Sequence, residues 1–326
     1  MHYHIKGQFC GYRFVCCFLF YIVLLTAAFT GGCTKEGRVS SEKTCHETGE
    51  KNVRDATPLV LVPEPSGKVT YGEGCVSVDA SNTSEGYIMM SYTGTNEKVK
   101  FQVRTPDETE YTYLVTETGK YSAYPLSGGN GTYQLTLLES VSVEENLYAV
   151  VFTRSIKVTI KDEFSPFLYS NYYVDFSEDS AAVAKGKELA MNCSCDLDVV
   201  SNIYHYVIHN ISYDTQKAGE VAYGYTPDVD ETLEGGKGIC FDYAALMSAM
   251  LRSQKIPTKL EVGYVGEVYH AWISCYVDEI GWIDNIIEFD GENWSLMDPT
   301  LAADNDSDEV KKYIGDGSRY VVKYTY

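Results

Sequence analysis

Apolar and polar residues alternate with a period of two between Leu59 and Lys161. The runs 99–104 and 133–137 show it most clearly, because every second residue in them is Val, Phe, Leu or Tyr. Such alternation is typical of a strand with one buried face. Further short strands are predicted at 87–92, 111–115, 147–152 and 156–160, with Gly- and Asn-containing turns between them. We therefore predict an all-β domain over 59–161, of the immunoglobulin-like sandwich type.

After about residue 165 the apolar residues recur at helical spacing. One helix is predicted over Asp179–Ala190, and a second begins at Asp196 or Asp198, either of which can cap it. A third helix, rich in Ala and Met, begins at or near Cys240 and ends before Pro257, because residues that precede a proline avoid the helical region. This change of period marks a second domain, which we place at 165–326.

Strands are predicted after the third helix. The runs 268–277 and 292–300 contain aromatic and β-branched residues, and Asp290-Gly291 between them is a turn signal. A closing strand is predicted at 320–326. The second domain is therefore of the α+β class. An aromatic junction, residues 164–173, lies at its start, and the composition of this junction predicts a fixed contact between the domains rather than a loose linker.

The chemistry of the chain centres on Cys240, which follows the glycine-rich run 235–238. A cysteine in the first helical turn faces unpaired amide N–H groups and the helix dipole, which favour the thiolate. Glycines lack a Cβ atom and let another chain approach the sulfur closely. This arrangement is how a nucleophile is built. The alternative is a buried structural cysteine beside a flexible loop, and for an isolated cysteine that is the more common case.

Two later residues change that balance. His270 lies on the predicted strand 268–277, and Asp298 lies on the predicted strand 292–300, just before Pro299. A thiol nucleophile needs a base, and the base needs a partner that fixes its tautomer and stabilises the imidazolium. We predict that Cys240 attacks, that His270 carries the proton, and that Asp298 orients His270.

The motifs around these residues are GKGICFDYA, YHAWI and WSLMDPT. With them, the segment 175–326 resembles the transglutaminase-like superfamily, a branch of the papain-like thiol enzymes. The resemblance implies a triad at Cys240, His270 and Asp298, a Cys-bearing helix packed on an antiparallel sheet, and thioester acyl transfer. The family includes glutamine–lysine cross-linkers, proteases, deglycosylating amidases and members without known activity, so it defines the chemistry better than the substrate.

We expect a thiol enzyme that acts on peptide or carboxamide bonds, with hydrolysis a little ahead of cross-linking and without a cofactor. Its substrate would be a peptide or protein, such as a cell-wall peptide. Two alternatives stay open. One is a protein cross-linking transglutaminase, and the other is a non-enzymatic surface protein that binds a glycan or a protein through the β-sandwich.

The residues expected to surround the thiol are less well defined. The segment 212–234 has no clear periodicity, and a long loop before a nucleophile often forms one wall of a substrate cleft. Tyr213, Tyr223 and Tyr225 are candidates to line that wall, or they fill the core. The backbone N–H of Cys240 is expected to bind the tetrahedral oxyanion, and no second donor is identified.

Trp272 shares a strand face with His270, since successive side chains of a strand alternate between two faces. It either shields the thioester from water or belongs to the core, and we favour the core.

The N-terminal segment 1–33 has the layout of a signal peptide. Two basic residues precede an apolar run from Phe14 to Phe29, and small residues then lead to Cys33. Its end resembles a bacterial lipobox, with Cys33 as the lipid-attachment residue, and the alternative is an uncleaved signal anchor. The polar stretch 34–58 is expected to be a disordered tether. Either reading places the chain outside the cytoplasm, on the extracellular face of a bacterial membrane.

Composition excludes some partners and leaves others open. The net charge of −20 over 326 residues makes nucleic acid an unlikely partner. His205 and His209 have metal-ligand spacing, and 228–231 and 304–308 are acidic runs, but none completes a known metal motif, so no metal is predicted. The pairing of Cys45, Cys75, Cys193, Cys195 and Cys275 cannot be read from the sequence, and reduced thiols are equally compatible with it.

Overall fold

The computed structural model describes residues 53–278, 280–284, 288–289, 294–295 and 320–326. All of them lie in one compact unit, Cys45–Tyr326, and a preceding unit, Met1–Thr44, lies outside the described residues. Cys33 and Asp298 therefore cannot be placed, nor can the acidic run 304–308 and most of the predicted strand 292–300. No helix in the described part of the chain combines the length and apolar character needed to cross a bilayer.

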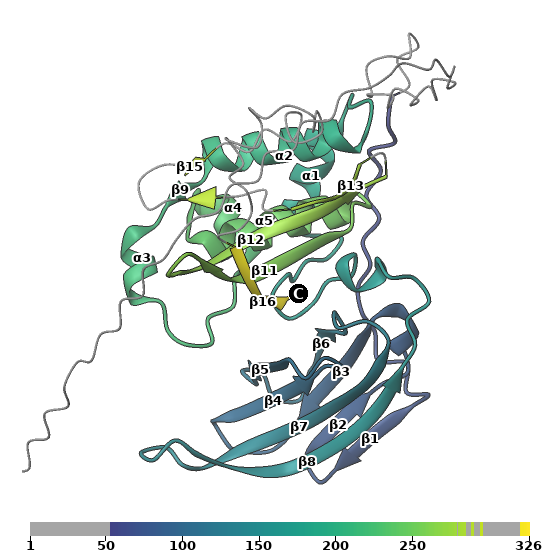
Figure 1. Ribbon diagram of the computed structural model, residues 1–326, viewed down its shortest axis with the longest axis vertical. Helices are drawn as coiled ribbons and strands as arrows, with labels where there is room; N and C mark the ends of the chain where they lie inside the picture. The colour runs from purple at the N-terminus through teal and green to yellow at the C-terminus, as the bar shows by residue number, and fades with distance from the viewer. Residues whose placement is uncertain (1–52, 279, 285–287, 290–293, 296–319) are drawn as a thin grey trace, which may run out of the picture. The chain divides into compact units, whose positions relative to one another are not determined.

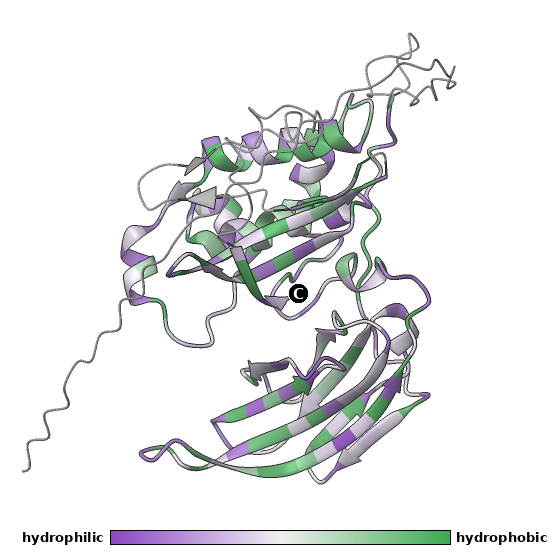
Figure 2. Cartoon of the chain, viewed as in Figure 1, coloured by the Kyte–Doolittle hydropathy of each residue, from purple (hydrophilic) through white to green (hydrophobic). Residues whose placement is uncertain are grey.

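Two four-stranded antiparallel sheets form the first part of this unit (Figure 1). The first has the strand order β1-β2-β3-β6, and the second has the order β5-β4-β7-β8. Their bounds are β1 Thr70–Glu73, β2 Val76–Asp79, β3 Tyr87–Tyr92, β4 Val99–Arg104, β5 Glu110–Leu114, β6 Tyr121–Pro125, β7 Gly131–Ser142 and β8 Leu147–Val158. Hydrophobic and hydrophilic positions alternate along several of these strands (Figure 2), as the period-two pattern requires.

The two sheets contact each other through aromatic side chains. The ring of Tyr124 on β6 lies 4.8 Å from that of Phe101 on β4 and 4.7 Å from that of Tyr113 on β5, measured between centroids. One expectation fails in detail: the two short strands predicted at 147–152 and 156–160 are the single strand β8, because its ladder with β7 continues without a break from Phe152 to Ile156. The immunoglobulin-like sandwich type stays a prediction.

Five α-helices follow within the described residues. They are α1 Ala181–Ala190, α2 Asp196–Asn210, α3 Thr215–Glu220, α4 Val229–Gly235 and α5 Cys240–Ser253. The segment 212–234 thus contains two helices, α3 and α4, although it shows no periodicity. Both helices are too short to show a helical repeat. They are capped by the carboxylates of Asp214 and Asp228. Neither expected residue caps α2, since its N-cap position is Cys195 and the Asp198 carboxylate accepts from the N–H of Ser194.

A four-stranded antiparallel sheet completes the unit, with the order β13-β12-β11-β16. Its strands are β11 Thr258–Val265, β12 Val268–Val277, β13 Gly281–Ile283 and β16 Tyr320–Thr325. Helix α5 contacts β11 and β12 as well as α1, α2 and α4, and every residue from Asp242 to Ser253 is buried. Cys240, the partly buried first residue of this helix, is thereby fixed beside the strand that carries His270.

Arg252, near the end of α5, holds three segments together. Its guanidinium is fully buried and donates to the backbone oxygens of Thr258 (3.0 and 2.8 Å), Tyr169 (2.8 Å) and Tyr326 (2.8 Å). No carboxylate side chain pairs with it in the described part of the chain. Burial lowers the pKa of Arg252 to about 9, which still leaves it charged at neutral pH.

The aromatic junction makes the fixed contact that its composition predicts. The ring of Tyr173 lies 4.7 Å from that of Tyr326 and 5.7 Å from that of Tyr113. Tyr111 of β5 also contacts Tyr326, at 5.5 Å. The first sheet pair and the second part of the unit therefore share an interface of tyrosines, in which edge-to-face ring contacts add to the burial of the rings.

Candidate active site

Cys240 is the first residue of α5, and its neighbours explain the glycines before it. The carboxylate of Asp242 accepts from the N–H of Ile239 at 2.8 Å, which fixes the start of the helix. A Cβ atom on Gly238 would lie 2.7 Å from the Cβ of Asp242, so only glycine fits there. Gly236 has a φ of 58° and ends α4. Gly238 thus makes room for Asp242, and Gly236 allows the turn that ends α4 before the nucleophile.

A cavity of about 720 Å³ brings Cys240 and His270 together. The three tyrosines expected in a substrate wall, Tyr213, Tyr223 and Tyr225, line the same cavity. Tyr223 is 77% exposed and therefore lies at the rim. Other lining residues come from β5, the aromatic junction, β11, β12 and β16. They include Thr112, Leu114, Tyr173, Tyr269, Ala271 and Tyr324.

The thiol is not activated in the way that its helix-start position suggested. Burial raises the pKa of Cys240, although hydrogen bonds from the backbone of Ala271 and Phe241 act in the opposite direction. The nearby carboxylate of Asp242 also raises it. The expectation of an easily ionised thiol is thus wrong for the described residues, because desolvation outweighs the helix-start amides. The bond from Ala271 nevertheless places the sulfur directly beside the strand that carries His270.

His270 is also held neutral. It is 6% exposed, and burial lowers the pKa of its imidazole to about 4. Its Nε2 atom is buried without a hydrogen-bond partner among the described residues. No hydrogen bond or ion pair joins His270 to Cys240 in the described part of the chain. A neutral imidazole is the form that a general base needs. A hydrogen bond between a base and its nucleophile often forms or shortens only when substrate binds.

Acidification is expected to destabilise the protein through His270. The unfolded imidazole takes up a proton below its ordinary pKa of 6.5, whereas the folded one stays neutral down to about 4. Its contribution to stability is thus present above pH 6.5 and is lost as the pH falls toward 4. Between pH 7.5 and 4.5, urea unfolding should show that wild type loses about 2–3 kcal/mol more than His270→Gln. An equal loss in the two proteins would show that the pKa of the imidazole is the same in the folded and the unfolded chain.

Trp272 belongs to the core. It is fully buried, does not line the cavity, and its ring lies 6.5 Å from that of His270. Its Nε1–H donates to the carboxylate of Glu261 at 2.9 Å, and Ser274 donates to the same oxygen at 2.7 Å. Burial raises the pKa of Glu261. The sequence analysis missed Glu261, and a lone acid in the apolar run of β11 was the available signal.

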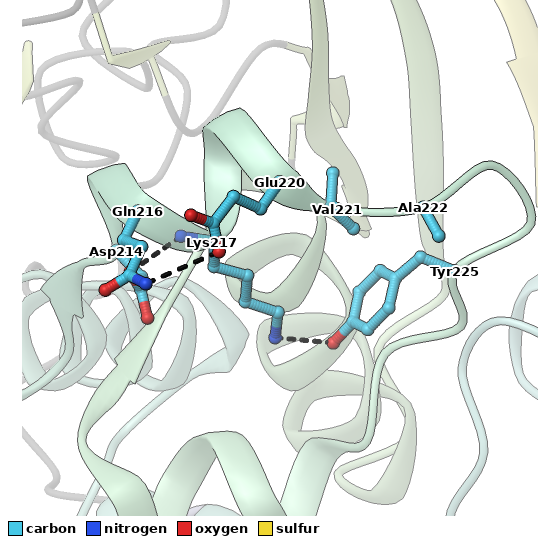
Figure 3. A pocket seen from close by; sticks show the side chains of 7 residues that line it. All are labelled: Asp214, Gln216, Lys217, Glu220, Val221, Ala222 and Tyr225. Atoms are coloured by element: carbon cyan, nitrogen blue, oxygen red, sulfur yellow. Dashed lines mark hydrogen bonds between the residues drawn. The ribbon is translucent and has the colours of Figure 1, made fainter.

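A polar network lies beside the nucleophile, and its anchor, Asp242, was not among the residues predicted from the sequence. The Nζ of Lys217 lies 2.6 Å from the hydroxyl of Tyr225 (Figure 3) and 2.8 Å from the fully buried carboxylate of Asp242. That hydroxyl also donates to Asp242. The segment 221–225 is thereby fixed to the first turn of α5. An acid three residues after the helix N-cap was the sequence signal for Asp242.

The other candidate ligands have structural roles. Asp228 caps α4, and Asp230 accepts from the N–H of Ala182 at 2.9 Å. The Nδ1 atoms of His205 and His209 each bond a backbone carbonyl one turn earlier. No group of three or more metal-ligating side chains is found among the described residues.

The cysteines divide into two classes. Cys195 is disulfide-bonded, whereas Cys75, Cys193, Cys240 and Cys275 are free thiols. Cys193 and Cys195, only two residues apart, therefore do not pair with each other. The partner of Cys195 is not among the described residues, because every other described cysteine is free.

Residues 184–285, which include Cys240 and His270, match the family model described as the transglutaminase-like superfamily. Over 170 residues, 45% of this chain, the sequence is 31% identical to UPF0252 protein MJ1282 of Methanocaldococcus jannaschii. The match covers 46% of that protein, so the chain spans about half the length of the curated relative it matches.

Among solved structures, the chain is similar to a "putative cysteine protease" of Cytophaga hutchinsonii, at 17% identity and a TM-score of 0.33 over 60% of this chain and 77% of that one. It is also similar to the periplasmic domain of TgpA from Pseudomonas aeruginosa, at 15% identity and a TM-score of 0.30 over 68% of this chain and 75% of that one.

Proposed function

We propose that this chain, whose residues 184–285 match the transglutaminase-like superfamily, is a thiol acyl-transfer enzyme that opens peptide or carboxamide bonds. Cys240 is the nucleophile, His270 the base, and Asp298 the residue that orients His270. The observation that carries this proposal is the shared cavity, where the Cys240 sulfur receives a backbone hydrogen bond from the residue after His270. The unpartnered, buried Nε2 of His270 supports a hydrogen-bond acceptor at that atom, and Asp298 would supply it.

The reaction follows from the neutral state of both groups. The Cys240 sulfur attacks the carbonyl carbon while its proton passes to His270, so that charge develops only as the bond forms. His270 then gives that proton to the leaving amine, and a thioester remains on Cys240. Water, deprotonated by His270, attacks the thioester carbonyl and releases a carboxylic acid and the free thiol. An amine in place of water would give a new amide.

Two groups are placed to stabilise the tetrahedral oxyanion. The backbone N–H of Cys240 is one, as the sequence analysis expected. Tyr213 is the candidate for the second, because its hydroxyl accepts a hydrogen bond from the backbone of Cys240, which partly offsets the burial that raises the pKa of Tyr213. A carbonyl oxygen that takes the place of the hydroxyl at this N–H would lie within reach of the displaced Tyr213 O–H.

Hydrolysis is the expected outcome of the thioester. Trp272 is fully buried and does not line the cavity, so it does not shield the thioester from water. We expect a casein digest incubated with the protein and monodansylcadaverine to yield new carboxylic acids, detected by mass spectrometry, with Cys240→Ala as the inactive control. Dansylated amide products would contradict hydrolysis and favour the cross-linking alternative. If wild type yields neither new carboxylic acids nor dansylated amides, the proposal that the chain is an enzyme is contradicted.

The site of action we propose is the outer face of a membrane, with the chain anchored by lipid at Cys33. The signal-peptide layout of 1–33 and the disulfide of Cys195 support this, since disulfides persist mainly in oxidising compartments outside the cytosol. A tethered enzyme meets substrates at the cell surface, so peptides of the cell wall or of neighbouring proteins are the proposed substrates.

A further inference from the structure

The first sheet pair contributes residues to the cleft that holds the nucleophile. Thr112 and Leu114 of β5 line the same cavity as Cys240 and His270. Among the described strands, β5 pairs only with β4 and so forms one edge of its sheet. An edge strand presents backbone N–H and C=O groups to which a further strand can bind.

The register of β4 and β5 shows which backbone groups face outward. The N–H of Thr105 donates to the C=O of Thr109, and the N–H of Val115 donates to that of Val99. Both bonds join directly opposite residues of an antiparallel pair, so the bonded pairs recur at every second residue between them. Thr112, opposite Gln102, belongs to a pair that is not hydrogen-bonded. Its N–H and C=O therefore point away from β4.

The edge is fixed on both sides of Thr112. On one side, the hydroxyl of Tyr111 accepts from the N–H of Thr325 at 3.2 Å. On the other side, the hydroxyl of Tyr172 donates to the C=O of Leu114. Within the described part of the chain, no turn, loop or side-chain hydrogen bond reaches the backbone of Thr112. Among the described residues, the outward N–H and C=O of Thr112 are therefore not engaged, while Tyr111 and Leu114 on either side are hydrogen-bonded to other segments.

The segment 221–225, which forms another wall of the cleft, packs closely against this edge strand. Gly224 has a φ of 84°, and a Cβ atom there would lie 2.1 Å from the Cδ1 of Leu114. The next residue, Tyr225, is hydrogen-bonded to Lys217 (Figure 3) and to Asp242, two residues after the nucleophile. The segment 221–225 therefore bridges β5 and the start of α5, and it keeps the edge strand and the thiol in one cavity.

We propose that an extended peptide substrate binds as an added strand on β5 and exchanges two main-chain hydrogen bonds with Thr112. The substrate N–H donates to the Thr112 C=O, and the Thr112 N–H donates to a substrate C=O. This inference rests on the proposed function, because the peptide bound at β5 is the acyl donor that Cys240 attacks. Main-chain groups are common to all residues, so this contact favours extended peptides over small amides whatever their side chains.

The test is the rate at which Cys240 is alkylated by chloromethyl ketones of increasing length. N-acetyl-alanyl chloromethyl ketones with one to four alanines carry almost no side-chain information, so any gain with length reports main-chain contacts. In the full chain, we expect the four-alanine probe to alkylate Cys240 at least roughly tenfold faster than the one-alanine probe, since two hydrogen bonds form. Mass spectrometry of the labelled peptide confirms the modified residue.

Two variants of Thr112 separate its backbone from its side chain. Thr112→Pro removes the outward N–H, and edge strands tolerate proline at such positions. We expect it to reduce the length-dependent gain to less than about threefold. Thr112→Ala keeps the N–H and should keep the gain. Both variants lose the same side-chain bond, from the Nε2 of Gln102 to the Thr112 hydroxyl, so they are matched in that respect.

A substrate-side measurement covers the case in which Thr112→Pro does not fold. Probes with N-methylalanine at one position at a time are applied to wild type, and one position should lose most of the gain because its N–H no longer reaches Thr112. A length-independent rate at Cys240, or a full gain for Thr112→Pro and for every N-methylated probe, overturns this inference alone. If none of the probes alkylates Cys240, the proposed function is overturned as well.

Discussion

Cys240→Ala is expected to abolish both thiol labelling in the cleft and acyl-transfer activity. Cys240 is the one free thiol among the described residues that lines the cavity, and its sulfur is hydrogen-bonded to the His270 strand. Loss of the attacking group removes the covalent step, so turnover of labelled casein should fall by roughly 10⁴-fold or more. An iodoacetamide-alkyne probe, with its site mapped by mass spectrometry, checks the labelling.

Cys75→Ala is the matched control for this measurement. Cys75 is a partly exposed free thiol on the loop between β1 and β2, within the first sheet pair. Its replacement removes one reactive sulfur of the same chain without touching the cleft, so labelling at residue 240 and casein turnover should both persist. Unchanged turnover in Cys240→Ala would exclude Cys240 as the nucleophile. The cavity that Cys240 shares with His270 would then not be the active site.

Arg252→Met is expected to lower the free energy of unfolding by about 3 kcal/mol. The substitution removes the cost of burying the charge, but it leaves the backbone oxygens of Thr258 and Tyr169 without their guanidinium donors. Each unpaired, buried carbonyl costs about 1–3 kcal/mol. The bond to Tyr326 is also lost, although the N–H of Leu260 still donates to that oxygen at 2.9 Å.

The measurement is urea unfolding at neutral pH followed by circular dichroism. Arg104→Met is the control, because Arg104 is half exposed and its ion pair with Glu108 lies at the surface. Its stability should change by less than about 0.5 kcal/mol. A loss below about 1 kcal/mol in Arg252→Met would mean that burying the charge costs almost as much as its hydrogen bonds contribute.

Much of the local structure could be predicted because it depends on neighbours in the sequence. The alternation in 99–104 gave the strand β4, and the predicted strand 268–277 has the bounds of β12. Helix α5 begins at Cys240, as the Ala- and Met-rich run after the glycines indicated. Prediction was weaker where elements are short. Helices α3 and α4, with six and seven residues, are too brief to display a period of 3.6.

The partners of the site residues required the folded chain. Asp242 and Lys217 are 25 positions apart, and nothing in the sequence near either residue indicates that they meet. The same holds for Thr112, which reaches the cavity of Cys240 from a different part of the unit. Sequence motifs point to distant residues of one site only when a family pattern links them, as it does for Cys240 and His270, which line one cavity.

The sequence by itself determined which side chains can do chemistry here, the elements that carry two of them, and the family they resemble, because periodicity and motif order are local properties. The tertiary structure decided how readily these side chains gain or lose a proton. Burial, which depends on every element packed around the cavity, makes the Cys240 thiol harder to ionise and the His270 imidazole harder to protonate. It also decided that an edge strand from the first sheet pair forms a wall of the cleft, since only long-range packing brings β5 to the start of α5.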